Sequence, residues 1–515
     1  GLRRAEAASA AQVGRRVFHH GVASGDPLTD RVILWTRVTT PAQTPPEVRW
    51  EVSRNAAFTR IVTRGMTRTG AARDFTVKID AVGLAPATTY YYRFETLGER
   101  SPVGRTRTLP GSDARRVRLA LASCSNLPFG YFNVYRRIAA RADLDAVLHL
   151  GDYIYEYPNG RYGDGTPFGR VPRPDREIVA LADYRMRHAQ YRSDPDLQEV
   201  HRQHPFIVVW DDHEITNNAW RDGAENHNPD LGEGEYAARR AAAVQAYLEW
   251  MPIREDPSTR LPRIYRSFAF GDLVDLIMLD TRLVDRDEQA ERRESIAVID
   301  DPKRSLLGRA QEAWLFAELA ASKRANVTWQ LLGQQVMFAP CSLPGANAVS
   351  TDTWDGYRYG RQRIIDAIAG QKLPNVVVLT GDVHSSWGYD IAQNPWDGYD
   401  PATGRGTLAV EIVTPAVTSP SGFANEGGAE RMASTRKSRP HLRYLEGLRR
   451  GYVVLDVTRE RAQADWYFVP TVTVRTRVEE FGKGLVTEAG NPHLVEAASA
   501  VPARQDVDEP APHTM

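Results

Sequence analysis

The chain has 515 residues, which is enough for roughly two to four domains of ordinary size or for one very large domain. Hydrophobic residues make up 42% of it and charged residues 25%, a composition that excludes a disordered or collagen-like protein. Because Lys+Arg and Asp+Glu both number 65, the formal net charge is +0, and nucleic-acid binding is not expected. The two cysteines, Cys124 and Cys341, allow at most one disulfide bond, and no apolar run approaches the roughly 18 residues of a transmembrane helix.

The first part of the chain has the pattern of a β-sandwich. After a tail over residues 1–16, short runs of alternating apolar and polar residues are separated by Pro and Gly clusters. The segment 84–94, in which a Leu-Ala-Pro turn leads into alternating aromatic residues, resembles the tyrosine corner of fibronectin-type sandwiches. We therefore expect a fibronectin-like β-sandwich domain over residues 17–110 that serves as a scaffold. Its clearest predicted strands are 32–38, 48–52 and 75–79.

Beyond a Pro-Gly-Ser linker at residues 110–114, apolar strands alternate with longer, helix-compatible stretches, which indicates an α/β fold. Helices are predicted at 235–249 and 311–323. We expect this second domain to occupy residues 114–490. A C-terminal extension rich in Ala, Pro and acidic residues then follows over residues 491–515.

Five apolar runs of this second domain end abruptly in polar residues. An Asp after a strand is usually a turn former or a helix cap, but five such ends in one α/β domain are harder to explain in that way. Ligands of open α/β sheets gather outside the carboxyl ends of the strands, and Cys, Tyr, Asp and His are metal-ligand types. The runs are 118–123, before Cys124; 146–150, before Asp152; 206–210, before Asp211; 327–332, before Gln334; and 376–380, before Asp382.

Four of these ends form motifs, namely Ser-Cys124-x-Asn126, Gly-Asp152-Tyr-x-Tyr155-Glu, Trp-Asp-Asp212-His213-Glu and Gly-Asp382-Val-His384. Taken in order, they resemble the PhoD-like alkaline phosphatase/phosphodiesterase family, which belongs to the calcineurin-like metallophosphoesterases. The resemblance extends over most of the chain, to about residue 470. The family includes secreted bacterial phospholipases D that depend on metal ions and lack the paired His-Lys-Asp motifs. The resemblance implies a metallophosphoesterase α/β/β/α sandwich over residues 114–490.

The resemblance also implies two metal sites. Fe3+ would be held by Cys124, Asp152, Tyr155 and His384, whose thiolate and phenolate are anionic donors suited to a ferric ion. Asp152 would bridge to a second site with Asp212 and Asp382, where oxygen ligands favour Ca2+ over Zn2+ or Mn2+. Further candidates for ligands or for residues that support them are Gln334, Asn217 and Asp211.

With such metals, the implied reaction is attack of a metal-activated hydroxide on the phosphorus of a phosphate ester. His213 is the candidate to protonate the leaving oxygen or to bind the phosphate, and Asn126 to hydrogen-bond a phosphoryl oxygen. The substrate expected is a phosphodiester, including a phospholipid at a membrane surface, so that the enzyme would have phospholipase D activity. We expect a secreted monomer, with the extension 491–515 as a candidate lid over the active site.

Other interpretations of these residues stay open at this point. Cys124 could be a buried apolar residue or half of a bridge to Cys341, and Tyr155 could be a packing aromatic. Arg282 could lie near the site, although an ion pair with Asp280 or another acid is the simpler interpretation. At the level of function, one alternative is an alkaline phosphatase that acts mainly on monoesters. Another is an extracellular binding module with an inactive hydrolase-like domain, which the complete ligand set disfavours.

Overall fold

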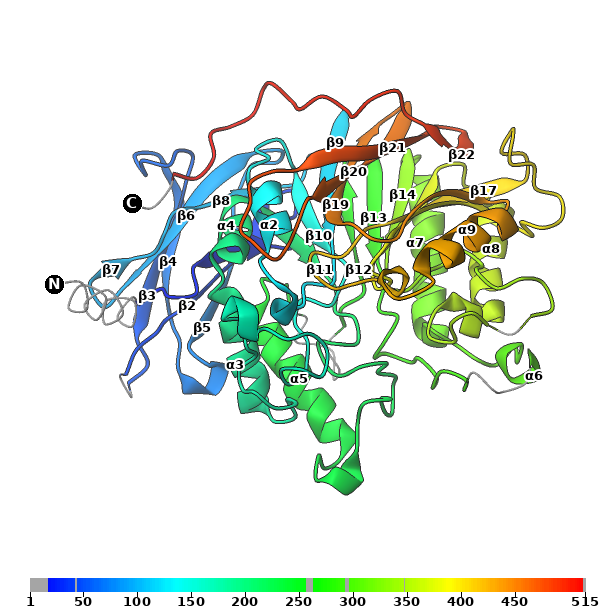
Figure 1. The fold of residues 1–515 in the computed structure, drawn as a ribbon. Coiled ribbons are helices and arrows are strands. Elements are labelled where there is room, and N and C mark those ends of the chain that lie inside the picture. The colour runs from blue at the N-terminus through cyan, green and yellow to red at the C-terminus, as the bar shows by residue number, and fades with distance from the viewer. Residues whose placement is uncertain (1–16, 42–43, 256–262, 292–295, 347, 513–515) are drawn as a thin grey trace.

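The structure, a computed structural model, describes residues 17–41, 44–255, 263–291, 296–346 and 348–512. Within these ranges the strands form sheets of ten, seven and five strands, with the five-stranded sheet at the left of the molecule and the seven-stranded sheet toward the right (Figure 1). The tail expected over residues 1–16 falls outside the described residues. Among the described residues, we find no helix with the length and apolar character needed to cross a bilayer.

The largest sheet has the strand order β22-β21-β20-β19-β9-β10-β11-β1-β2-β5. Strands β9, β10, β11 and β1 run parallel to one another, so their carboxyl ends meet at one edge of the sheet. The bounds of the strands are β1 Val22–Gly25, β2 Arg31–Arg37, β5 Thr76–Val82, β9 Arg116–Ala122, β10 Ala146–His149, β11 Pro205–Val208, β19 Arg450–Thr458, β20 Arg461–Val469, β21 Glu480–Glu488 and β22 Asn491–Glu496.

The second sheet has the order β12-β13-β14-β15-β17-β16-β18, and β13, β14, β15 and β17 are parallel. Its bounds are β12 Arg266–Phe270, β13 Val274–Met278, β14 Trp329–Gly333, β15 Val376–Thr380, β16 Ser386–Ala392, β17 Thr407–Val413 and β18 Leu442–Glu446. The five-stranded sheet contains β3 Glu47–Ser53, β4 Ile61–Arg68, β6 Thr89–Thr96, β7 Glu99–Arg100 and β8 Gly104–Arg107.

The period of two along a strand explains how the second sheet is covered on both faces. Leu276 and Leu331 belong to the hydrophobic core that contains β9 and β10. Their neighbours Ile277 and Leu332 point the other way, into a core shared with the outer helices α7 and α8. The result is two facing sheets with helices outside them, which confirms the expected α/β/β/α arrangement.

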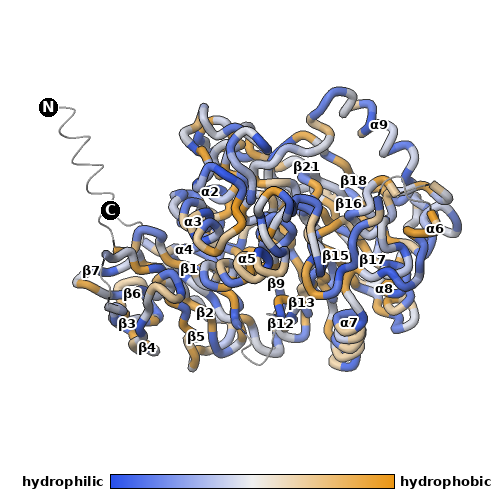
Figure 2. Tube along the Cα trace, turned by 90° about the horizontal axis from the view of Figure 1, so that it is seen from below, coloured by the Kyte–Doolittle hydropathy of each residue, from blue (hydrophilic) through white to orange (hydrophobic). Residues whose placement is uncertain are grey.

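The predicted helices 235–249 and 311–323 correspond to α5 and α7. Helix α4 shows a local start signal, because Asp194 accepts hydrogen bonds from the backbone N–H groups of Asp196 and Leu197 and Pro195 is the first helical residue. Only Gly428 and Met432 are buried in α9, and this hydrophilic helix lies at the edge of the molecule in Figure 2. The helices are α2 Asn133–Ala139, α3 Leu181–Arg192, α4 Pro195–Gln203, α5 Tyr236–Trp250, α6 Ile296–Ile299, α7 Gly308–Arg324, α8 Arg358–Gln371 and α9 Gly428–Ser438.

The N-terminal β-rich part is a sandwich, and the predicted strands 32–38, 48–52 and 75–79 correspond to β2, β3 and β5. The tyrosine hydroxyl of Tyr90 accepts a hydrogen bond of 2.8 Å from the Ala85 N–H, five residues upstream, as a tyrosine corner requires. The sequence did not indicate that one of its two layers would be continuous with the ten-stranded sheet. That continuity comes from the parallel pairing of β1 with β11.

The C-terminal extension does not have the position that a lid over the strand ends would need. After β22 the chain returns toward the N-terminal sandwich, drawn in red in Figure 1. Arg504 pairs with Asp145 at 2.6 Å, the Pro502 carbonyl accepts from Arg118 at 2.8 Å, and Ala511 donates to Gln203 at 2.9 Å. All three contacts lie at the amino ends of parallel strands. Arg118 is near the start of β9, Asp145 directly precedes β10, and Gln203 precedes β11. The candidate site lies at the opposite, carboxyl ends, so the expected lid is wrong.

Candidate active site

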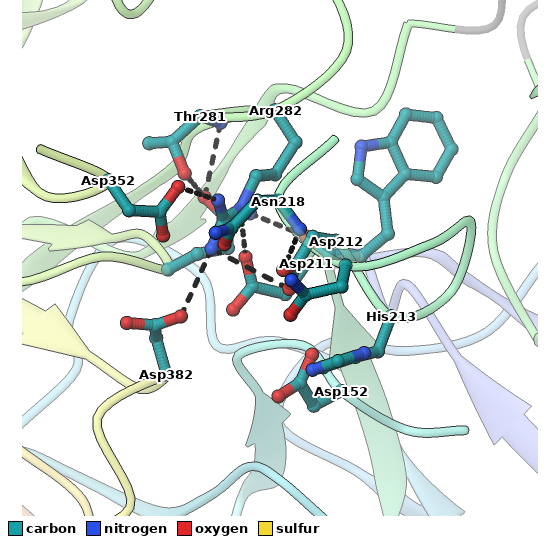
Figure 3. Close-up of polar contacts among 12 residues, drawn as sticks. Asp152, Asp211, Asp212, His213, Asn218, Thr281, Arg282, Asp352 and Asp382 are labelled. Atoms are coloured by element: carbon teal, nitrogen blue, oxygen red, sulfur yellow. Dashed lines mark hydrogen bonds and ion pairs between the residues drawn. The ribbon is translucent and has the colours of Figure 1, made fainter. Parts of the chain in front are cut away.

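A cavity of about 390 Å³ opens at the carboxyl ends of the parallel strands. It brings together residues from loops that are far apart in the sequence, and Figure 3 shows how the acids of this region converge on Arg282. The residues that line the cavity are Asp152, Tyr157, Arg161, Tyr162, Asp212, His213, Asn217, Asn218, Asp382 and His384.

Four of the predicted metal ligands have an unusual backbone conformation. Cys124, Asp152, Asp382 and His384 have φ of 60°, 56°, 62° and 57°. A residue with a side chain rarely adopts positive φ, and each instance costs on the order of 1–3 kcal/mol. Strain of this kind clusters at functional sites, where the surrounding structure holds the side chains in place.

The loops after β10 and β11 are held together by Glu214, a residue that the sequence reasoning missed. Its carboxylate accepts hydrogen bonds from the backbone N–H of Asp152 at 3.1 Å and of Asp211 at 2.7 Å. Burial raises the pKa of Glu214 to about 8. The two loops approach so closely that a Cβ on Gly151, at φ +104°, would lie 2.4 Å from the Cβ of Asp211. The only signal for Glu214 in the sequence was its place at the end of the Asp-Asp-His-Glu motif.

The first ligand group contains Cys124, Asp152, Tyr155 and His384. Tyr155 donates its hydroxyl proton to Asp152 Oδ2 at 2.8 Å, and its oxygen lies 3.3 Å from His384 Nε2. Ligand atoms of Cys124, Asp152 and His384 all lie within 4.8 Å of one another. His384 Nδ1 lies 2.9 Å from the carbonyl of Pro420, so Nδ1 carries the proton and the lone pair of Nε2 faces the group.

Burial raises the pKa of the Cys124 thiol well above its usual value, and the charge of Asp152 raises it further. The same two causes raise the pKa of the Tyr155 hydroxyl. Burial also raises the pKa of Asp152, to about 7. The thiol of Cys124 and the hydroxyl of Tyr155 are therefore protonated at neutral pH unless a cation binds them. Binding of a cation would release these protons.

The second group contains Asp211, Asp212 and Asp382, which surround the fully buried Arg282. Arg282 donates to Asp211 through Nε, and to Asp382 at 3.0 Å through Nη2. Its third nitrogen pairs with Asp352 at 2.7 Å (Figure 3). Burial raises the pKa of Asp382 to about 7. The side chain of Arg282 thus pairs with acids of the site and not with Asp280, which instead accepts from the Arg282 backbone N–H at 2.9 Å.

His213 lies between the two groups, where the neighbouring acids favour its protonated form by raising its pKa. Its Nδ1 lies 2.7 Å from Glu156 Oε2, and the other oxygen of Glu156 accepts from the Asn217 N–H at 2.8 Å. Burial alone would lower the pKa of His213, but the charges of Asp212 and Glu156 raise it well above its usual value. The ring packs against Tyr155, with a centroid distance of 4.3 Å. A protonated imidazole at the cavity wall is suited to act as a general acid.

The predicted site residues that do not line the cavity are Cys124, Asn126, Tyr155, Asp211 and Gln334. Gln334 donates to Thr380 Oγ1 at 2.6 Å and accepts from Trp354 Nε1 at 3.1 Å, so its amide is fully engaged elsewhere. Asn126 is buried and donates to the carbonyl of Tyr162 at 3.1 Å, behind the Tyr162 ring. Cys341 is a free thiol, as is Cys124, so the two do not form a bridge. Asn217 does line the cavity, and Asp211 is held by Arg282.

The acids of the site fit bound cations. Three buried carboxylate oxygens, Asp152 Oδ1, Asp211 Oδ2 and Asp212 Oδ1, have no hydrogen-bond partner among the described residues. Such atoms are rare in native proteins, and a metal ion is one of the few partners that satisfies several at once. The fold and these candidate ligand groups together are typical of metal-assisted hydrolases built on facing α/β sheets.

The comparisons with known proteins place the chain more narrowly. The family model "PhoD-like phosphatase" matches residues 119–466, and the model "PhoD-like phosphatase, N-terminal domain" matches residues 4–110. Alkaline phosphatase D of Bacillus subtilis (strain 168) is 40% identical over 479 residues, which cover 88% of this chain and 78% of that protein. A solved structure described as "Structure of PhoD" superimposes with a TM-score of 0.84 at 36% identity and covers 95% of this chain and 94% of that one. The chain belongs to the PhoD-like phosphatase family and is a hydrolase of phosphoric ester bonds.

Proposed function

We propose that this hydrolase is a secreted, metal-dependent phosphodiesterase whose substrates include phospholipids, from which it releases the head group as a phospholipase D does. The observation that carries the proposal is that Asp152 offers an oxygen both to the cluster with Cys124 and His384 and to a further cluster with Asp212 and His213, beside one cavity. The cavity volume of about 390 Å³ corresponds to roughly 13 water volumes of about 30 Å³ each. We take this space, which is open to solvent, to accommodate both arms of a diester.

We assign Fe3+ to Cys124, Asp152, Tyr155 and His384, because a thiolate and a phenolate suit a ferric ion. We assign Ca2+ to the oxygen ligands Asp152, Asp212 and Asp382, with the side chain of Asn217 at the same wall and Zn2+ or Mn2+ as the alternatives. When bound, these cations lower the pKa of a water molecule and offset the charge on the phosphoryl oxygens.

The protein's own side chains supply the remaining parts of the reaction. Protonated His213, held by Glu156, donates its proton to the leaving oxygen. Tyr162 lies over the site, with its ring 6.5 Å from those of both His213 and His384 and nearly parallel to them. Asn126 holds the loop that carries Tyr162. Arg282 keeps the acids of the second group in position without reaching the cavity wall.

The choice of ester is tested by comparing rates on phosphatidylcholine vesicles, on an aryl phosphodiester and on an aryl phosphomonoester. We expect choline release and faster cleavage of the diester than of the monoester. If no choline is released, the phospholipase D assignment is wrong. Activity confined to the monoester would instead favour the alternative of an alkaline phosphatase, which the name of the Bacillus relative supports.

The remaining assignments have direct tests of their own. Elemental analysis together with the visible spectrum tests the metals, because Fe3+ bound by thiolate or tyrosinate gives a charge-transfer band. Fractionation of the native culture tests secretion, and light scattering tests the expected monomer. An active protein also excludes the alternative of a binding module with an inactive hydrolase-like domain.

A further inference from the structure

Arg192, the last residue of α3, is a fully buried cation at the junction of the N-terminal sandwich and the catalytic sheet. Its guanidinium lies 4.2 Å from the centroid of the Trp35 ring, which belongs to β2. The acids that follow it in the sequence are already engaged, because Asp194 pairs with Arg170 and Glu199 with Arg202. Its Nε and Nη2 have no hydrogen-bond partner among the described residues.

The other fully buried arginines of the described residues have acids or several carbonyls as partners, although Nε of Arg118 and of Arg286 is also without a hydrogen bond. Arg187 directs its guanidinium at several backbone carbonyls, among them that of Tyr157 at 3.1 Å. The remaining ones pair with acids, as in Arg118 with Asp143 at 3.2 Å, Arg239 with Glu177 at 2.8 Å, and Arg282 and Arg286 with Asp352 at 2.7 and 2.5 Å. Within the part of the chain that the structure describes, the guanidinium of Arg192 has one hydrogen-bond partner, the hydroxyl of Tyr153 at 3.5 Å from Nη1. A buried charge without a counter-ion is very costly, so this position calls for one.

Polar atoms of several neighbours are also left unpartnered. They belong to the N-terminal sandwich and to helices α3 and α4, and each side chain is buried. Among the described residues, the atoms without a partner are His20 Nδ1, Ser24 Oγ, Tyr92 OH, His188 Nδ1 and Nε2, and His201 Nδ1. Buried polar groups are almost always hydrogen-bonded, and a cluster of orphans marks a place where water or an ion is bound.

The neighbouring histidines are neutral and leave the charge of Arg192 uncompensated. Burial lowers the pKa of His188 to about 3, and the charge of Arg192 contributes to the decrease. Burial and Arg192 likewise lower the pKa of His201 well below its usual value. The surroundings therefore hold the charge of Arg192 together with hydroxyl and imidazole N–H groups that can donate hydrogen bonds.

We propose that Arg192 is the centre of an internal binding site for a small monovalent anion of the halide class, which is chloride in ordinary salt solutions. The anion accepts from the Arg192 guanidinium and from the hydroxyl of Tyr92, on which the charge of Arg192 acts and beside which the Ser24 hydroxyl lies. A water molecule satisfies hydrogen bonds but not the charge, whereas a halide does both. Ser24 belongs to β1, Tyr92 to β6 and Arg192 to α3. The anion therefore links the N-terminal sandwich to α3 of the catalytic part.

The direct test is crystallographic. Crystals of the full chain are soaked in sodium bromide, and data are collected at the bromine absorption edge. We expect an anomalous peak in contact with the Arg192 guanidinium. Water density at this position without an anomalous peak would overturn the proposal.

The second test measures thermal unfolding of the metal-loaded protein in chloride and in gluconate at constant ionic strength. We expect the Tm to rise with chloride and then to level off, as it does when a ligand binds only the folded state. Arg192→Met removes the charge and should abolish the chloride dependence. Tyr92→Phe keeps the charge and should move the half-saturation point to higher chloride.

Arg64→Met, at an exposed position of β4, is the control for general salt effects and should keep the full chloride response. An equal response in Arg192→Met and in the wild type would show that chloride acts elsewhere and would overturn the proposal. If Arg192→Met does not fold, the response of Tyr92→Phe decides together with the bromide data. An unchanged half-saturation point in that variant, combined with the absence of a bromide peak, would likewise overturn the proposal.

Discussion

The charge on His213 depends on Glu156, and this dependence leads to a quantitative prediction for the pH profile. Glu156→Gln keeps the size of the side chain but replaces a carboxylate 2.7 Å from His213 Nδ1 by a neutral amide. A hydrogen bond between charged groups contributes about 1.5–3 kcal/mol, and one pKa unit corresponds to about 1.36 kcal/mol. The pKa of His213 should therefore fall by about one to two units in this variant.

The sign of the effect follows from the role of His213 as a proton donor. The pKa of His213 in the folded protein is raised, so its proton is present at neutral pH and is lost as the pH rises through that pKa. Lowering the pKa moves the alkaline limb of the profile to lower pH. The assay is kcat/KM as a function of pH with an aryl phosphodiester, and the alkaline limb of Glu156→Gln should lie about one to two units below that of the wild type.

Glu177→Gln is a matched control for this experiment. Asn226 donates to Glu156 at 3.1 Å and to Glu177 at 3.0 Å, so both acids belong to the same hydrogen-bond network. Glu177 itself pairs with Arg239 and does not contact His213. Its variant should leave the alkaline limb in place. If Glu156→Gln keeps its metal content and its alkaline limb does not move, the assignment of His213 as the proton donor is wrong.

Three further predictions concern metal, stability and domain coupling. Cys124→Ser replaces the only sulfur ligand, and we expect loss of any visible absorption together with loss of bound iron by elemental analysis; an unchanged spectrum would contradict the first ligand group. Arg282→Met leaves the buried acids around it unpaired and should reduce the free energy of unfolding of the metal-free protein by about 3–5 kcal/mol. Adding Ca2+ should restore part of this loss. An unchanged unfolding midpoint in denaturant would contradict this reasoning. Because β1 pairs with β11 across the expected boundary near residue 110, the units 17–110 and 114–490 should unfold in one calorimetric transition, and two separate transitions would count against a continuous sheet.

Local patterns in the sequence predicted several of the strands, two of the helices and the polar residues that follow the strands. Alternation with a period of two predicted β2, β3 and β5, and a Leu-Ala-Pro turn before aromatic residues predicted the corner at Tyr90. The polar residues at strand ends predicted which side chains would meet, because parallel strands bring their carboxyl ends to one edge. Cys124, Asp152, Asp212 and Asp382 were all identified in this way, and the structure brings them to one region.

The partners of these residues could not be predicted in the same way. Arg282 bonds Asp211 from 71 positions away and Asp382 from 100 positions away, and nothing near Arg282 in the sequence indicates which acids it will meet. The amide of Gln334 follows a strand just as the ligands do. Only its hydrogen bonds with Trp354 and Thr380 decide that it is engaged away from the cavity.

The position of the last residues shows the same division. Composition indicated a surface extension after residue 490, but the direction of that extension depends on ion pairs such as Arg504 with Asp145, 359 positions apart. The sequence by itself determined the periodicity, the turns and the chemical types of residue at each strand end, because these depend on neighbours along the chain. Tertiary structure decided the shared sheet, the acid cluster around Arg282 and the unpaired charge of Arg192, because each arises from contacts between segments that meet only after folding.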